Sequence, residues 1–448
     1  MLKREEIIEA LAPYNFWSRE RDVGIDREEY LSKLEHFKNA NDFILSVVGV
    51  RRAGKTTIAK QFIKKAIEDG TDPRDTLYVN LEDPKFHAYL STELLEEIYR
   101  AFKVYVSRGD SAVIVLDEVQ NVPNWEKWVR ATMEKERVKI LVTGSTSRII
   151  KRELATVLTG RTLTVEVFPL DFKEFLTFKG ITTEDYLTMM VEKSKIEKAL
   201  LEYLEFGGFP QVVLSRDELL KREIIKELFE GIVLRDVAYR GGFRDANAVK
   251  LIAELAVNRF ASLTSATRLK NEVSGILKRN VSPNFVDAVL DALEEVYLAF
   301  RVPPFSHKIK EVRRHPKKLY VIDTGIINAV ALRFSENLGR LAENLVAIHL
   351  IKCHGKDNVF YYKGKGEVDF IVKHGLEIKE AIQVSWDIEK SKKREISALL
   401  EALREFDLRE GLIVTERTEG VEEVEGKRIK YAPLWKFLLG EINEDRDE

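Results

Sequence analysis

Residues 43–57, FILSVVGVRRAGKTT, limit the fold of this chain more than any other segment. The segment begins with a short apolar run rich in β-branched residues, which is typical of a buried strand. Residues 49–56 then match the pattern GxxxxGK(S/T), and the next ten residues have helical periodicity. A strand, a glycine-bounded loop and a helix form the context in which this pattern binds phosphate, so we predict a P-loop here.

The predicted P-loop has the groups needed to hold a nucleoside triphosphate. Its glycines let backbone N–H groups point at phosphate oxygens, and the following helix adds the positive end of its dipole. Lys55 would reach the β- and γ-phosphates, and the Thr56 hydroxyl would ligate Mg²⁺. A chance match on a structural strand, turn and helix is the alternative. The predicted nucleotide-binding residues are Gly49, Arg51, Arg52, Ala53, Gly54, Lys55, Thr56 and Thr57.

A second apolar run, residues 112–116, ends in two carboxylates, Asp117 and Glu118. This is the pattern of a Walker B strand. Asp117 would complete the Mg²⁺ coordination, and Glu118 would polarise the attacking water as a general base. The alternative is that the carboxylates only cap a helix, but the P-loop upstream favours the catalytic interpretation.

Two further residues are candidates for catalytic roles. The strand that begins at Lys139 ends in small polar residues, and we predict that Ser145 senses the γ-phosphate, with Thr143 as its competitor. Arg161 follows a glycine on a loop and would stabilise the transferring phosphoryl group if a neighbouring subunit supplied it. The alternative for Arg161 is a surface salt bridge. Parallel strands joined by helices predict a doubly wound α/β sheet with the nucleotide at the carboxyl ends of its strands.

Several stretches of the chain closely resemble an archaeal and bacterial clade of AAA-type P-loop ATPases. They are GVRRAGKTT, VLDEVQNVPNWEKWV, TGSTSR, LTGR, FPLDFKEFL and FGGFP. Members of that clade join the ATPase to a winged helix and a restriction-endonuclease-like C-terminal domain, and the resemblance covers nearly the whole chain. It implies a core of the additional-strand, catalytic-glutamate type, in which Glu118 activates water, and it implies ATP rather than GTP.

The length of 448 residues exceeds one ordinary hydrophobic core, so several domains are expected. The expected fold class is α/β, with a P-loop parallel sheet followed by a helical lid, a winged helix and an α/β restriction-endonuclease-like domain. We predict N-terminal helices and the ATPase core at 1–183, the lid at 184–245, the winged helix at 246–330 and the last domain at 331–448.

The predicted winged helix offers conflicting evidence on nucleic acid. Its wing contains the densest basic run in the chain: Lys308, Lys310, Arg313, Arg314, His315, Lys317 and Lys318. A basic wing suits DNA phosphates. However, the expected recognition helix carries Asp287, Asp291, Glu294 and Glu295, and a net charge of −2 makes no electrostatic case for a polyanion. DNA bound through residues 308–318 and contact with a protein partner both remain open.

The C-terminal region resembles the core of PD-(D/E)xK nucleases, with a helix, a β-meander, a helix and a strand. In that fold, a carboxylate on the first helix, an Asp and a Glu-x-Lys hold a divalent metal, and the Lys helps polarise the phosphate. Glu343 and Asp369 match, whereas Gln383 and Ser385 replace the Glu and the Lys. Residues 377–379, Glu-Ile-Lys, are expected at a hairpin tip, away from Asp369. We therefore expect a nuclease fold with lost or weakened cleavage, because metal affinity falls with the missing charge.

Composition limits the environment of the protein. The single Cys353 excludes an internal disulfide framework and a Cys-based zinc site. A charged N-terminus without a signal-peptide pattern, and the lack of a membrane-spanning apolar run, predict a soluble cytoplasmic protein. Charged residues make up 33% of the chain, and Cys and Met are scarce, as in hyperthermophilic archaeal proteins.

Three functions are compatible with the sequence. The favoured one is a homo-oligomeric ATPase, with ATP and Mg²⁺, that couples hydrolysis to contacts with nucleic acid or a partner protein. The second is an ATP-gated, metal-dependent DNA nuclease, which Glu343 and Asp369 favour and Gln383 and Ser385 oppose. The third is a nucleotide-dependent signalling switch, in which the winged helix contacts only protein.

Overall fold

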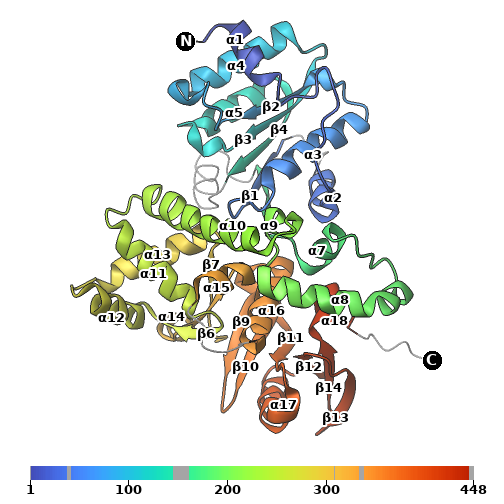
Figure 1. Ribbon diagram of the computed structural model, residues 1–448, viewed down its shortest axis with the longest axis vertical. Helices are drawn as coiled ribbons and strands as arrows, with labels where there is room; N and C mark the ends of the chain where they lie inside the picture. Colours follow the sequence, from blue (N-terminus) through green and yellow to red (C-terminus); the bar gives the residue numbers. More distant parts are fainter. Residues whose placement is uncertain (1, 38–41, 145–160, 307, 332–337, 443–448) are drawn as a thin grey trace. The chain divides into compact units, whose positions relative to one another are not determined.

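The computed structural model describes residues 2–37, 42–144, 161–306, 308–331 and 338–442. The chain separates into two compact units, Met1–Val167 and Phe168–Glu448 (Figure 1). Among the described residues, the first unit contains one five-stranded sheet, and the second contains a three-stranded and a six-stranded sheet. The helix α7 (Phe172–Phe178), which the sequence analysis placed with the ATPase core, belongs to the second unit.

The sheet of the first unit is entirely parallel, which confirms the predicted α/β core. Its strands are β1 (Ile44–Gly49), β2 (Thr76–Asn80), β3 (Ser111–Asp117), β4 (Arg137–Gly144) and β5 (Thr162–Val167). Their order is β2-β3-β4-β1-β5, so β4 lies between the P-loop strand and the Walker B strand. Every residue of β1 is buried, as expected for a strand with both faces covered.

Helices cover both faces of this sheet (Figure 1). They are α1 (Arg4–Leu11), α2 (Glu28–His36), α3 (Lys55–Glu68), α4 (Thr92–Tyr105) and α5 (Trp125–Lys135). The segment between α1 and α2 closes the edge strand β2. The Asn15 side chain pairs with the backbone of β2 as a neighbouring strand would. Its Nδ2 donates to Tyr78 O at 2.9 Å, and its Oδ1 accepts from Tyr78 N at 2.7 Å. Pairing by a side chain protects the edge from other chains.

The second unit begins with helices, as predicted for residues 184–245. They are α7, α8 (Tyr186–Phe206), α9 (Pro210–Leu214), α10 (Glu218–Glu230) and the π-helix η4 (Gly231–Tyr239). α15 (Thr324–Val330), far along the chain, packs against α8 and α10. The Asp323 carboxylate accepts hydrogen bonds from Gly208 N at 2.7 Å and Gly325 N at 2.8 Å, and burial raises its pKa to about 6. A Cβ on Gly207 would lie 2.0 Å from Asp323 Oδ1, and one on Gly208 would lie 2.2 Å from Leu170 O, which explains the glycine pair.

Residues 246–321 follow the order helix, strand, helix, helix, strand, helix, strand. The elements are α11 (Ala246–Asn258), β6 (Ser262–Thr264), α12 (Ala266–Leu277), α13 (Pro283–Glu295), β7 (Ala299–Val302), α14 (Ile309–Arg314) and β8 (Lys317–Val321). The strands form an antiparallel sheet in the order β6-β8-β7. The segment between β7 and β8, which was predicted as a β-wing, also contains the helix α14.

The last part of the second unit is built on a mixed sheet with the order β13-β14-β12-β11-β10-β9. Its elements are α16 (Leu338–His354), β9 (Val359–Lys363), β10 (Glu367–His374), β11 (Glu377–Val384), α17 (Ile388–Glu405), β12 (Glu410–Thr415), β13 (Gly420–Val424), β14 (Lys427–Pro433) and α18 (Leu434–Leu439). The apolar face of α17 packs on this sheet through Leu399 and Leu403, which contribute to a core with Val368 and Ile413. No helix in the described ranges has both the length and the apolarity to cross a membrane.

Candidate functional site

The P-loop connects β1 to α3 at the carboxyl edge of the parallel sheet (Figure 1). Gly49 has a φ of 149°, and a Cβ there would lie 2.0 Å from Val167 O on the neighbouring β5. Gly54, with a φ of 98°, begins α3, and Arg52 has a φ of 62°. Glycine is therefore required at position 49 because β5 lies so close, and at position 54 because the backbone there is left-handed.

Lys55 is folded across the loop that precedes it. Its Nζ donates to Gly49 O and to Val50 O, each at 3.0 Å, and the residue is buried. The following α3 presents its amino-terminal N–H groups to the same loop. An ammonium and a helix N-terminus are therefore directed to one place, which is the arrangement that a phosphate requires.

A buried arginine holds the loop from outside the motif. Arg27, just before α2, donates from its guanidinium to Ala53 O at 2.7 Å and lies 4.5 Å from the centre of the Tyr30 ring. Gln61 on α3 donates to Ile25 O at 2.8 Å, which anchors the same segment. The sequence analysis missed Arg27, because a single arginine outside any motif gives no signal until the fold buries it.

Asp117 lies at the carboxyl end of β3, beside the P-loop helix. Its Oδ2 accepts hydrogen bonds from Thr56 Oγ1 at 2.8 Å and from the Tyr78 hydroxyl at 2.5 Å, and its Oδ1 accepts one from the Thr143 hydroxyl. Burial raises the pKa of Asp117. The structure thus brings together Thr56 and Asp117, the two residues that the sequence assigned to Mg²⁺, and adds Tyr78 and Thr143.

Glu118 follows in a left-handed conformation, with a φ of 58°. Its backbone N–H donates to Thr143 Oγ1 at 3.0 Å, and its carboxylate accepts a hydrogen bond from Gln120 Nε2 at 2.5 Å. Thr143 therefore contacts both carboxylate residues, through Asp117 Oδ1 and Glu118 N. Ser145, the first choice of the sequence analysis for this strand end, lies outside the described residues.

Arg161 lies at the opposite edge of the sheet from the P-loop. Its carbonyl accepts a hydrogen bond from Ile44 N at 3.0 Å, at the start of β1, and its side chain is exposed. The strand β1 has six residues, and its five rises of roughly 3.3 Å each place this edge about 16 Å from the start of the P-loop. Arg161 and Lys55 of one chain are therefore not brought together.

A second polar cluster, which we call the Lys318 cluster, lies in the second unit where β8 meets α16 and β10. Lys318 Nζ lies 3.0 Å from Glu343 Oε1, 2.9 Å from Glu367 Oε1 and 2.7 Å from Asp369 Oδ1. The Tyr320 hydroxyl donates to Glu343 Oε1 at 2.8 Å. Burial and the neighbouring Asp369 raise the pKa of Glu343 to about 7. Burial alone would lower the pKa of Lys318, but the surrounding anionic groups raise it.

Gln383 and Ser385, whose own side chains are uncharged, make hydrogen bonds beside this cluster. Gln383 Oε1 accepts a hydrogen bond from Asp369 N at 3.1 Å, and its Nε2 donates to Glu395 at 2.6 Å. Ser385 Oγ shares a hydrogen bond of 2.8 Å with Ser391. Gln383 therefore lies next to Asp369, whereas Ser385 is paired with α17.

The contacts of Lys318 correct the predicted DNA-binding wing. Lys318 was expected to face phosphates, but it is buried among carboxylates because β8 is the central strand of its sheet and packs against α16. Lys308 pairs with Glu311 at 3.2 Å. The side chain of Arg313 lies outside the described residues, whereas Lys310, Arg314 and His315 are exposed.

The acidic face of α13 is also explained by contacts within the chain. Arg301 on β7 lies 3.0 Å from Asp287 and 2.8 Å from Glu294, and it also pairs with Asp291. The three carboxylates therefore hold α13 on its own sheet. They are not, as the sequence alone suggested, simply a face that repels a polyanion.

Comparisons with known proteins cover most of the chain. Residues 41–176 match a family described as an AAA domain, and residues 197–337 and 338–437 match two domains of unknown function, DUF8612 and DUF4143. The chain is 37% identical over 407 residues to the uncharacterized protein MJ1544 of Methanocaldococcus jannaschii. The aligned region covers 88% of this chain and 87% of that protein. It is 28% identical over 411 residues to an uncharacterized protein of Haemophilus influenzae, covering 92% and 98% of the two chains.

Proposed function

This chain belongs to the same family as MJ1544 and carries an AAA domain, and we propose that it is a Mg²⁺-dependent ATPase. The observation that carries the proposal is the convergence of Lys55, Thr56 and Asp117 on one loop at the carboxyl edge of the sheet. A hydroxyl and a carboxylate 2.8 Å apart are hard oxygen donors, which suit Mg²⁺. The residues present therefore fit the nucleotide and the ion that the P-loop pattern implies.

The proposed roles follow from the contacts of each side chain. Lys55 would exchange its two carbonyl acceptors for phosphate oxygens, and the N–H groups that begin α3 would bind the same phosphates. Mg²⁺, when bound between Thr56 and Asp117, would neutralise phosphate charge. Glu118 would accept a proton from the attacking water. Thr143 would hold both carboxylate residues in place. It is therefore a better candidate than Ser145 for the polar residue at the strand end that senses the γ-phosphate.

Replacing Glu118 with glutamine should separate binding from hydrolysis. The amide keeps the size of the side chain but cannot accept the proton, so we expect unchanged ATP affinity and hydrolysis slower by about a hundredfold. Phosphate release at saturating ATP and the affinity for a fluorescent ATP analogue measure the two properties. Glu134→Gln is a matched control, because Glu134 is exposed on α5 and pairs with Arg130 at the surface. Hydrolysis at the wild-type rate in Glu118→Gln would remove Glu118 from the mechanism.

We further propose that the ATPase acts as an oligomer in which Arg161 serves the site of a neighbouring copy. The support is its exposed position at the sheet edge opposite the P-loop, from which it does not serve its own site. An arginine supplied by a neighbour stabilises charge on the transferring phosphoryl group.

Replacing Arg161 with alanine should therefore lower turnover at least about tenfold without changing ATP affinity. Specific activity should rise with protein concentration as the molar mass rises, which light scattering records in the same samples. Arg137→Ala, an exposed arginine at the start of β4 on the same edge, is the matched control. A monomer whose turnover does not depend on Arg161 would instead favour the signalling switch.

The remaining parts of the chain are interpreted as follows. The order of elements over residues 246–321 and their three-stranded antiparallel sheet support a winged helix. Lys310, Arg314 and His315 are exposed basic residues of the predicted wing, and they would contact DNA or an acidic protein surface. The four-part division of the chain remains a proposal, with a helical lid between the ATPase and the winged helix.

The Lys318 cluster supports a restriction-endonuclease-like domain that does not cleave. Glu343 and Asp369 lie together as they would around a metal ion, but the ammonium of Lys318 lies between them and already offsets part of their negative charge. Gln383 adds no charge, and Ser385 provides no cation. The nuclease alternative is therefore the weaker of the two enzymatic functions, because a metal would have to displace a buried and charged side chain.

A further inference from the structure

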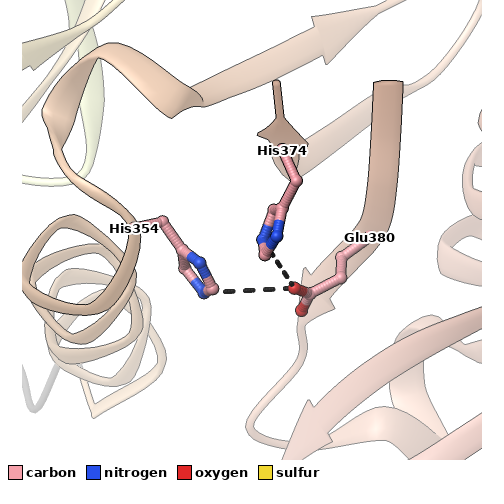
Figure 2. Close-up of side chains that lie close together, drawn as sticks. All are labelled: His354, His374 and Glu380. Carbon is pink, nitrogen blue, oxygen red and sulfur yellow. Dashed lines mark ion pairs between the residues drawn. The ribbon is translucent and has the colours of Figure 1, made fainter. Parts of the chain in front are cut away.

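Two histidines and one glutamate converge at a corner of the C-terminal sheet, apart from both clusters described above (Figure 2). His354 is the last residue of α16, His374 is the last residue of β10, and Glu380 lies on β11. His354 Nε2 lies 3.9 Å from Glu380 Oε1, and His374 Nε2 lies 3.8 Å from the same oxygen. Both imidazole rings are turned toward the Glu380 carboxylate (Figure 2).

The fold itself produces this convergence. The antiparallel register of β10 and β11 places Glu380 opposite Val372, two residues before His374. α16 packs against both strands, and its last residue reaches the same corner. The two imidazole rings lie with their centres 4.8 Å apart. Three elements that are separate in the sequence therefore each contribute one side chain.

We propose that His354, His374 and Glu380 form a binding site for a divalent transition-metal ion, best suited to Zn²⁺. Two imidazole nitrogens and one carboxylate oxygen are a ligand set of open zinc sites, in which water takes the fourth position. Mg²⁺ and Ca²⁺ prefer ligand sets made only of oxygen, so this set distinguishes the site from the Thr56–Asp117 pair.

The two distances between imidazole and carboxylate suit this ion after a small adjustment, and all three ligand atoms lie within 4.8 Å of one another. Zn–N and Zn–O bonds of about 2.0 to 2.1 Å in a tetrahedron place neighbouring ligand atoms about 3.3 Å apart. The contacts of 3.8 and 3.9 Å therefore need to shorten by about half an ångström. The side chains of His374 and Glu380 are 48% and 40% exposed, so small rotations meet little resistance.

A simple ion pair is a weaker explanation for the cluster. Contacts of 3.8 and 3.9 Å are longer than a charge-assisted hydrogen bond, which spans about 2.7 to 2.9 Å. The three side chains therefore gain little from one another directly, whereas a metal ion between them would bind all three. Bound metal would join the end of α16 to the β10–β11 hairpin and so would stabilise the folded second unit by mass action.

Zinc titration of the full chain tests the proposal. The protein would be free of any affinity tag, stripped with a chelator, without nucleotide, and in excess Mg²⁺ so that oxygen-only sites are occupied. A Cys353→Ser background removes the exposed thiol next to His354 as a competing ligand. Calorimetry should show one Zn²⁺ per chain, and saturating Zn²⁺ should raise the Tm by about 5 °C.

Two variants in the same background locate the site. His374→Ala and Glu380→Gln should each weaken Zn²⁺ binding by about tenfold or more, and both should keep the Tm of the metal-free protein. His315→Ala is the matched control, since His315 is exposed and lies outside the cluster, and its affinity should be unchanged. The proposal is overturned if the background protein binds no Zn²⁺, or if either ligand variant binds as tightly as the control.

Discussion

Replacing Lys55 with alanine should abolish ATP binding in the working range and reduce hydrolysis to background. Lys55 is the cation of the P-loop, buried and held by the carbonyls of Gly49 and Val50. Removing one partner of a buried charge pair costs about 2 to 5 kcal/mol. That free energy corresponds to ATP binding that is about 30-fold to 4,000-fold weaker.

Equilibrium titration with a fluorescent ATP analogue and phosphate release together measure this effect. Lys64→Ala is the matched control, because Lys64 lies on the same helix but only pairs at the surface with Glu68, at 3.8 Å. An exposed pair of this kind contributes little to stability. ATP affinity in Lys55→Ala equal to that of the Lys64 control would show that the loop is not a nucleotide site.

Replacing Lys318 with methionine should destabilise the second unit by about 3 to 5 kcal/mol. Methionine fills a similar volume but leaves Glu343, Glu367 and Asp369 without the cation that lies within 3.0 Å of each. Calorimetry of the full chain should show the loss in the unfolding transition of the second unit. Lys308→Met is the matched control, because its side chain is 78% exposed and pairs with Glu311 at the surface.

The loss of stability in Lys318→Met should be larger at high pH than at low pH. The pKa of Glu343 is already raised to about 7, and removal of the ammonium would raise it further. A carboxyl group whose pKa is higher in the folded state stabilises that state at low pH, and this stability is lost as the pH rises through the folded-state pKa. Lys318→Met should therefore be closer to wild type at about pH 5 than at about pH 8.

Neutralising the carboxylates separates the charge effect from packing. Adding Glu343→Gln and Asp369→Asn to Lys318→Met should recover most of the lost stability, since a neutral replacement of a whole buried ion cluster is often tolerated. Added Mn²⁺ should also raise the Tm of Lys318→Met more than that of Lys308→Met, because a divalent ion can replace the ammonium. Wild-type stability in Lys318→Met would contradict the role given to this lysine.

The local structure of the candidate nucleotide site was largely predictable from sequence because its parts lie in two short segments. The residues proposed to bind phosphate are consecutive, and the carboxylates come directly after an apolar strand, so the pattern of each segment contains its local structure. The fold then adds Arg27 and Tyr78, which contact Ala53 and Asp117 from other elements. No motif marks these two residues, since each acts through a neighbour that is remote in sequence.

The C-terminal clusters show the opposite case. Glu343 and Asp369 were selected through the resemblance to a nuclease core, but Lys318 was assigned to a basic run expected to face phosphates. A lysine in a charged stretch looks the same whether its strand lies at an edge or in the centre of a sheet. Likewise, nothing in the sequence connects His354 with His374 and Glu380, because only the packing of α16 on a hairpin brings them together.

The sequence by itself determined the parallel α/β core, the P-loop and the paired carboxylates, because hydrophobic periodicity and consecutive functional residues are local properties of a chain. The tertiary structure decided which charges are exposed and which are paired. It placed Arg161 on the edge opposite its own P-loop and buried Lys318 among three carboxylates. The physical reason is that desolvation and Coulomb energy depend on distance and burial in space, and a linear pattern does not contain these quantities.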